Sequence, residues 1–103
     1  MPHFLGIYRP PRPTFGTDST PEEDRIIGAH FQYLKRLLAD GKLILAGPCE
    51  DASMGIAVFE TKDEAEARDI LASDPAVTGG VFTCEMKPYR VSLVRSSTSR
   101  REP

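Results

Sequence analysis

The apolar residues of the stretch 25–38, RIIGAHFQYLKRLL, recur at spacings of three and four positions, as on one face of a helix. Thr20, Pro21 and Glu23 precede this stretch in the order of a capping box with proline at the first helical position. Gly41 follows it and readily takes the left-handed conformation that ends many helices. The pattern predicts a helix from Pro21 to the residues just before Gly41. Its inward face consists of Ile26, Ile27, Leu34, Leu37 and Leu38.

A second helical pattern lies in residues 59–75, FETKDEAEARDILASDP. Thr61 is the predicted N-cap, and Glu64 at the third position repeats the capping device of the first helix. Pro75 ends the helix, because the residue before a proline avoids the helical region. The inward face of this helix consists of Ala67, Ile70 and Leu71.

Four further stretches carry β-branched or aromatic residues and are bounded by Gly or Pro, which is typical of strands. They are residues 3–9, 42–47, 54–60 and 81–91. Together with the two helices they give the order β-α-β-β-α-β. This order predicts an α+β protein with the ferredoxin-like arrangement, a sandwich in which both helices cover one face of an antiparallel sheet.

The stretch 54–60, MGIAVFE, is apolar at both of its alternating sets of positions. Ile56 and Val58 fall on one face of the predicted strand, and Ala57 and Phe59 on the other. A sheet covered by helices on one side only should alternate apolar with polar residues, so the second face needs a cover of its own. A second copy of the chain is the simplest cover and predicts a homodimer packed sheet to sheet. The alternative is that the strand pattern is too weak to assign faces.

Two polar residues interrupt the inward faces of the predicted helices, His30 in the first and Asp74 at the end of the second. In the β-α-β-β-α-β order both positions lie near the same edge of the sheet, so we expect them to meet. A carboxylate beside an imidazole fixes its tautomer and favours the protonated ring, which makes the pair a candidate general acid/base. The alternative is structural: a hydrogen-bonded core histidine and an aspartate that closes a helix before proline.

Composition and charge argue against two classes of partner, nucleic acids and membranes. The 103 residues are 40% hydrophobic and 27% charged, with a formal net charge of −2, as in an ordinary globular domain. No basic stripe interleaves with aromatic residues, which argues against nucleic acid as a partner. No apolar run approaches the ~20 residues that span a bilayer, so no membrane segment is expected. The N-terminus lacks the pattern of a signal peptide, and the expected location is the cytoplasm.

Residues 1–94 form the single predicted domain, and the Ser/Arg-rich residues 95–103 are predicted to be a disordered tail. Cys49 and Cys84 do not form a C-x-x-C motif and are expected to be reduced thiols. No histidine has a second ligand at the spacing of a zinc site, so no metal is expected.

A proline-rich connection, residues 9–20, joins the first strand to the first helix at the edge where His30 and Asp74 should meet. Arg9 or Arg12 would hold an anionic substrate there by bidentate hydrogen bonds. The alternative is that both are solvated arginines on a stiff connector.

Gly47 and Pro48 end a strand at the same part of the fold. They are expected to line the substrate pocket without taking part in the chemistry.

Several of these elements together resemble the YCII-related (YciI-like) family. The resemblance rests on His30, the segment ADGKLILAGP with its glycine and Gly-Pro, the Asp-Pro at residues 74–75, and the segment MKPYRV, and it covers residues 3–91. It implies a ferredoxin-like α+β fold that pairs into a dimeric α+β barrel. It also implies an active site built on a His–Asp pair, which falls on His30 and Asp74 of this chain.

One branch of this family is similar to dehydrochlorinases that act on chlorinated hydroxyquinols, and no cofactor is implied. The chain departs from the family at Ala76, where relatives tend to place an aromatic residue, and in its long proline-rich connection. A smaller residue at position 76 predicts a pocket of different shape.

The leading hypothesis is therefore a small cofactor-free enzyme that uses His30 and Asp74 for acid/base chemistry on a small organic substrate, aromatic or halogenated in the implied branch. One alternative is a non-catalytic dimeric module that binds a small molecule or a protein. A third hypothesis is a structural dimer in which the hydrogen bond between the two residues only holds the helices together.

Overall fold

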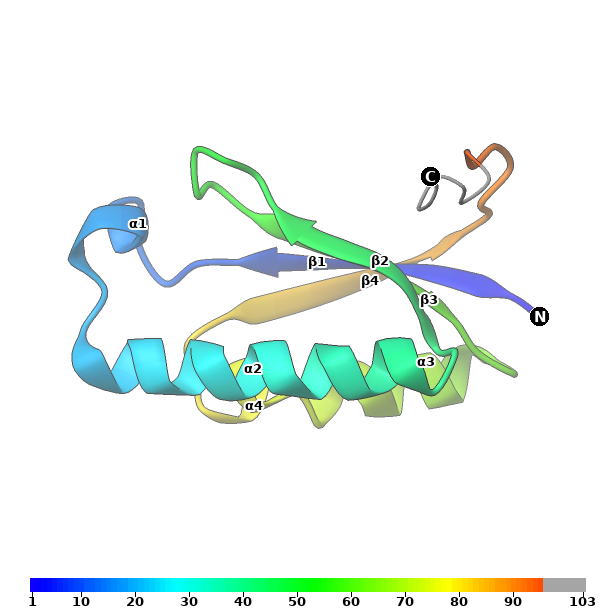
Figure 1. Ribbon diagram of the computed structural model, residues 1–103, viewed down its shortest axis with the longest axis horizontal. Helices are drawn as coiled ribbons and strands as arrows, with labels where there is room; N and C mark the ends of the chain where they lie inside the picture. The colour runs from blue at the N-terminus through cyan, green and yellow to red at the C-terminus, as the bar shows by residue number, and fades with distance from the viewer. Residues whose placement is uncertain (96–103) are drawn as a thin grey trace.

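The computed structural model describes residues 1–95, which form one antiparallel sheet with helices on one of its faces (Figure 1). The strands are β1 (His3–Arg9), β2 (Leu43–Pro48), β3 (Gly55–Glu60) and β4 (Thr83–Tyr89). The helices are α1 (Phe15–Asp18), α2 (Pro21–Ala39), α3 (Glu64–Ala72) and α4 (Pro75–Thr78). The strand order in the sheet is β2-β3-β1-β4. These observations confirm the predicted ferredoxin-like α+β fold.

Helix α2 begins and ends where its capping residues predicted. The Thr20 hydroxyl accepts a hydrogen bond from the Glu23 backbone N–H at 3.1 Å, and the Glu23 carboxylate accepts one from the Thr20 N–H at 2.9 Å. This reciprocal pair is the predicted capping box. Gly41 has a φ of 77°, the left-handed conformation that a glycine adopts without steric strain.

The predicted N-cap of the second helix is wrong by two residues, because Asp63 and not Thr61 caps α3. The Asp63 carboxylate accepts a hydrogen bond from the Glu66 backbone N–H at 2.9 Å. Thr61 is fully buried and its backbone N–H donates to the carbonyl of Pro2 at 3.1 Å. Since Thr61 still bonds to the residue before β1, the helix starts only after the chain has left the sheet.

Two short helices were not predicted. Helix α1 lies inside the proline-rich connection, and α4 begins at Pro75, with Asp74 as its N-cap. The backbone N–H groups of Val81 and Phe82 both donate to the carbonyl of Ala76, at 3.0 and 2.9 Å. These bonds occupy the residues expected to open the last strand, so β4 begins only at Thr83.

The core lies between the sheet and helices α2 and α3. Its buried members are Tyr8, Leu34, Leu37, Leu43, Ala57, Phe59, Ile70 and Leu71. Three residues of the predicted inward face of α2 are less buried: Ile26 and Ile27 are half-buried, and Leu38 is 55% exposed. Ile27 and Leu38 line a cavity beside the helix, which leaves part of their surface uncovered.

The face of the sheet opposite the helices is also apolar, which confirms the two-faced pattern of β3. Ile56 and Val58 alternate with core residues, and Val58 pairs in register with Leu5 of β1. A groove on this face is lined by these three residues together with Val91 and Leu93 after β4. Leu93 is 95% exposed in the single chain. A sheet-to-sheet homodimer remains a prediction that this face supports.

The predicted tail, residues 95–103, lies outside the described residues except for Arg95. Its disorder stays a prediction. Among residues 1–95, no helix is both long enough and apolar enough to span a membrane.

Candidate active site

The structure brings together the two polar residues that interrupt the inward helix faces. His30 lies in the middle of α2, and Asp74 is the N-cap of α4. The His30 Nδ1 atom lies 2.8 Å from both carboxylate oxygens of Asp74. The His30 side chain is 12% exposed and the Asp74 side chain is fully buried. The predicted meeting of these two residues is confirmed, whereas their catalytic role stays a prediction.

The buried Asp74 carboxylate has two further hydrogen-bond donors. The Tyr8 hydroxyl donates to Asp74 Oδ2 at 3.0 Å, and the backbone N–H of Ala76 donates to Oδ1 at 2.9 Å. A carboxylate away from water is stable as an anion only when such donors replace its hydration. The site is therefore a buried carboxylate with three donors, and His30 is the donor that is partly exposed.

The hydrogen bonding of Asp74 determines which nitrogen of His30 carries the proton in the neutral ring. An ionised carboxylate only accepts hydrogen bonds, so Nδ1 must be the donor. Within residues 1–95 no protein group bonds to the other ring nitrogen, Nε2, which keeps its lone pair. Tyr8 and Phe82 hold the ring by edge-on contacts, with ring centroids 5.1 and 5.7 Å from that of His30.

A cavity of about 650 Å³ lies beside His30, between α2 and the β2–β3 hairpin. Its wall is mostly apolar and includes Ile27, Leu34, Leu43, Ala46, Met54 and Phe82. The polar side chains in the wall are those of Tyr8, His30 and Lys35. Gly47 and Pro48 line the cavity, and their predicted contact with a substrate stays a prediction. A largely apolar cavity with few polar groups is the usual form of a small-molecule site.

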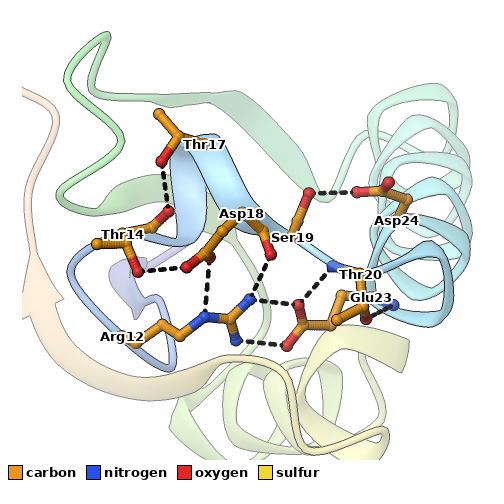
Figure 2. Close-up of polar contacts among 8 residues, drawn as sticks. All are labelled: Arg12, Thr14, Thr17, Asp18, Ser19, Thr20, Glu23 and Asp24. Carbon is orange, nitrogen blue, oxygen red and sulfur yellow. Dashed lines mark hydrogen bonds and ion pairs between the residues drawn. The ribbon is translucent and has the colours of Figure 1, made fainter.

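Arg9 and Arg12 are not among the residues that line this cavity. Arg9 forms an exposed ion pair with Glu85 on β4 at 3.0 Å. Arg12 donates to both carboxylate oxygens of Glu23 at 2.8 Å, and to the carboxylate and the carbonyl of Asp18 at 2.9 Å (Figure 2). These partners occupy the Arg12 guanidinium, so the structure does not support Arg12 as a substrate-binding residue. The Arg9 guanidinium is likewise occupied, by Glu85 of the neighbouring strand.

The Arg12 network instead ties the connection 10–18 to the first turn of α2. The hydrogen bonds from Arg12, assisted by the Thr20 backbone N–H, lower the pKa of Glu23 to about 2. The Asp18 carboxylate also accepts from the Thr14 hydroxyl at 2.6 Å, which closes α1 on itself (Figure 2). The sequence holds a local signal for this network, because Asp18 and Glu23 lie 6 and 11 residues after Arg12.

The connection 10–18 contributes apolar residues, Pro10 and Phe15, to the cavity wall. Phe15 lines the wall, with its ring centroid 5.8 Å from that of Phe82 in an edge-on contact. Gly16 lies so close to Ala52 in the β2–β3 loop that a Cβ at position 16 would be 2.7 Å from the Ala52 Cβ. Helix α1 and the β2–β3 loop therefore meet at the edge of the cavity.

The comparison with known proteins agrees with the fold and the residue pattern. The sequence matches the YCII-related domain over residues 5–90. This chain belongs to the YCII-related family. The uncharacterised protein YjpA of Bacillus subtilis strain 168 is 32% identical to it over 65 residues, which are 63% of this chain and 76% of YjpA. The family membership inferred from the sequence is thus confirmed.

Two solved structures share the fold of this YCII-related chain. One is 5-chloro-2-hydroxyhydroquinone dehydrochlorinase (TftG) from Burkholderia phenoliruptrix AC1100, in complex with 2,5-dihydroxybenzoquinone. Its TM-score is 0.62 at 22% identity, over 84% of this chain and 93% of that one. The other is muconolactone isomerase, with a TM-score of 0.67 at 15% identity, over 91% and 96% of the two chains. At these identities the likeness shows the fold alone.

Two further residues of this YCII-related chain, Ala76 and Cys84, lie close to Asp74. Ala76 is a fully buried residue of α4 and does not line the cavity, so a larger side chain there would change the support of Asp74 rather than the cavity wall itself. Burial, followed by the charge of Asp74, raises the pKa of the Cys84 thiol to about 11. Cys84 is therefore a neutral thiol and no nucleophile at neutral pH.

Proposed function

We propose that this chain is a small cofactor-free enzyme in which His30, oriented by Asp74, transfers protons on a small organic molecule bound in the cavity. The observation that supports it best is the buried carboxylate on Nδ1, which leaves the Nε2 lone pair of a cavity-lining histidine free. The same arrangement of carboxylate and imidazole orients the base in other enzymes that use histidine as a general base.

In the proposed reaction the neutral His30 removes a proton from a carbon or hydroxyl group of the substrate. The imidazolium that forms is stabilised by the Asp74 carboxylate. In an elimination, the electron pair left on the substrate forms a new double bond as a leaving group departs with its own bonding pair, and the imidazolium then gives its proton to solvent. In an isomerisation, the pair shifts an existing double bond, and the proton returns to another carbon of the same molecule.

The two structural neighbours support this reaction class. One is named as a dehydrochlorinase, whose reaction removes HCl, and the other as an isomerase. Both outcomes follow from a single acid/base group that takes a proton at one atom and can return it at another. The largely apolar wall of this cavity suits a small aromatic or halogenated molecule.

The cavity also suggests how a charged substituent of the substrate would be held. Lys35, one turn after Phe31 on α2, contributes the ammonium group of the wall, and its Nζ lies 5.6 Å from the Phe31 ring centroid. No Asp or Glu side chain lines the cavity within residues 1–95. An anionic substituent would therefore point to Lys35, while Gly47 and Pro48 form the opposite wall.

The enzyme would act as a homodimer. The apolar sheet face opposite the helices supports a second copy packed against it, because Leu5 and Ile56 on this face are only half-buried and Leu93 beside it is 95% exposed. A stable interface of this kind would bury at least ~1,000 Å² in total.

The experiment that tests the function is a turnover screen with small phenolic and halogenated compounds. We expect His30→Gln to lower turnover of any active compound by about 100-fold or more, because a positioned general base contributes at least that much. His3→Gln is the matched control, since His3 lies on β1 outside the cavity. Binding of these compounds without turnover by the wild type would contradict the proposal and favour the non-catalytic module.

A further inference from the structure

We propose that Tyr8 is a positioning residue of the site: its hydroxyl orients the Asp74 carboxylate and weakens its attraction for the proton on His30. This inference rests on the proposed role of the His30–Asp74 pair as an acid/base group. It adds a third member to that pair, one that would adjust how easily the protonated ring gives its proton up.

The geometry of Tyr8 fits this role. The Tyr8 side chain is 3% exposed, and its hydroxyl donates to Asp74 Oδ2 at 3.0 Å. Its ring also packs edge-on against His30, with an interplanar angle of 72°. One residue of β1, an inner strand of the sheet, thus contacts both members of the pair.

Three ionisable side chains whose pKa values respond to the Asp74 charge, Tyr8, Tyr33 and Cys84, are neutral at neutral pH. Burial first, and then the charge of Asp74, raises the pKa of Tyr8 far above its ordinary value. The same two causes raise the pKa of Tyr33 on α2, and burial raises that of Cys84 on β4 to about 11. Tyr8 therefore remains a hydrogen-bond donor throughout the working pH range.

Among residues 1–95, Tyr8 is the side chain besides His30 that donates to Asp74. A neutral donor withdraws negative charge from a carboxylate without adding a positive charge of its own. When the Tyr8 hydroxyl is removed, the carboxylate should hold the imidazolium form of His30 more tightly. The ring would then release its proton less readily, and less of the basic form would be present at a given pH.

The test compares Tyr8→Phe with Tyr33→Phe. Tyr33 is the matched control, because its hydroxyl donates to the carbonyl of Ile70 at 2.8 Å and not to Asp74. The His30 ring resonances are followed by NMR as the pH is changed, with no substrate present. We expect the protonated ring to persist to a higher pH in Tyr8→Phe than in the wild type, and to be unchanged in Tyr33→Phe. Equal titration in all three proteins, or a shift to lower pH in Tyr8→Phe, would overturn the inference.

A graded substitution keeps the test decisive if Tyr8→Phe fails to fold. Replacement of Tyr8 by 3-fluorotyrosine keeps the ring and makes the hydroxyl a stronger donor, so the titration should move to lower pH. No movement, or movement in the other direction, would contradict a positioning role. The titration needs no substrate, so the two proposals can fail separately. Binding without turnover would reject the proposed enzyme and leave the titration result unchanged. A titration unaffected by Tyr8→Phe would reject the positioning role of Tyr8 and leave the turnover result unchanged.

Discussion

Two polar networks of this chain have similar hydrogen-bond lengths and different surroundings. At Asp74, a fully buried carboxylate is bonded to His30, Tyr8 and the Ala76 backbone at 2.8–3.0 Å. At Arg12, a guanidinium bonds to Glu23 and to the exposed Asp18 at 2.8–2.9 Å (Figure 2). The first network lies beside the cavity, and the second ties down a surface connection.

The difference in burial decides what each network does. Water can replace partners that the surface network of Arg12 loses, whereas the buried Tyr8 hydroxyl and Ala76 N–H lose their acceptor when the carboxylate is removed. The sequence marked both sites as candidates for substrate chemistry. Only the buried one has a ring nitrogen left free beside the cavity.

The largest expected effect is on stability, from Asp74→Ala. The substitution leaves the Tyr8 hydroxyl, His30 Nδ1 and the Ala76 N–H without their acceptor. At about 1 kcal/mol for each unpaired buried group, we expect the free energy of unfolding to fall by about 3 kcal/mol in urea titrations. Asp18→Ala is the control, with an expected change near the error of the measurement. Equal losses in the two variants would remove the contrast between the networks.

The next effect is a pH dependence of stability that belongs to the Arg12 network. The folded pKa of Glu23 is about 2, below the ordinary 4.5, so its carboxylate stabilises the fold fully above pH 4.5 and loses this effect as the pH falls toward 2. We therefore expect the melting temperature of the wild type to fall more steeply over this range than that of Glu23→Gln. Parallel curves would contradict the prediction. Glu50→Gln, in the exposed β2–β3 loop, is the control.

A smaller and local effect is expected from Arg12→Ala. Without the guanidinium, the connection should open more often, and the amide hydrogens of Phe15 and Thr17 should exchange several-fold faster with solvent. These amides donate to the carbonyls of Arg12 and Thr14 in the folded chain. The amide of Ala76, bonded to Asp74, should be unchanged. Faster exchange at Ala76 as well would show that the two networks are coupled. Arg25→Ala, which breaks an exposed pair within α2, is the control.

The smallest expected effect concerns the charge on the cavity wall. Lys35→Gln should weaken binding of benzoate by about two- to five-fold, the size of one exposed ion pair, and leave binding of benzyl alcohol unchanged. NMR titration measures both affinities, and Lys62→Gln is the control on a residue outside the cavity. An equal loss for the two ligands would mean that Lys35 contributes packing and not charge.

The features predicted well from the sequence depend on local chemistry or on topology. The ends of α2 follow from the capping box and Gly41, which act within a few residues. The meeting of His30 and Asp74 follows from the order of strands and helices, since that order places both at one edge of the sheet.

The features that were missed depend on contacts between distant parts of the chain. The start of α3 follows the bond from Thr61 to Pro2, and the hydrogen bond of Tyr8 joins it to a residue 66 positions away. The hydrophobic periodicity of the sequence does not indicate which buried hydroxyl donates to which carboxylate. Arg12 is the opposite case: its acidic partners are close in the sequence, and they bind the guanidinium that an anionic substrate would need.

The orientation of His30 is the central claim, and ¹⁵N NMR of the two histidine rings tests it most directly. At a pH where both rings are neutral, His30 should carry its proton on Nδ1, which donates to Asp74, and have a bare Nε2. His3 is an internal reference with the opposite expectation, because its Nδ1 accepts a hydrogen bond from the Val91 N–H at 3.1 Å. Opposite tautomers at His30 and His3 are the predicted result. A His30 ring with its proton on Nε2 would contradict the account, since no base would then face the cavity.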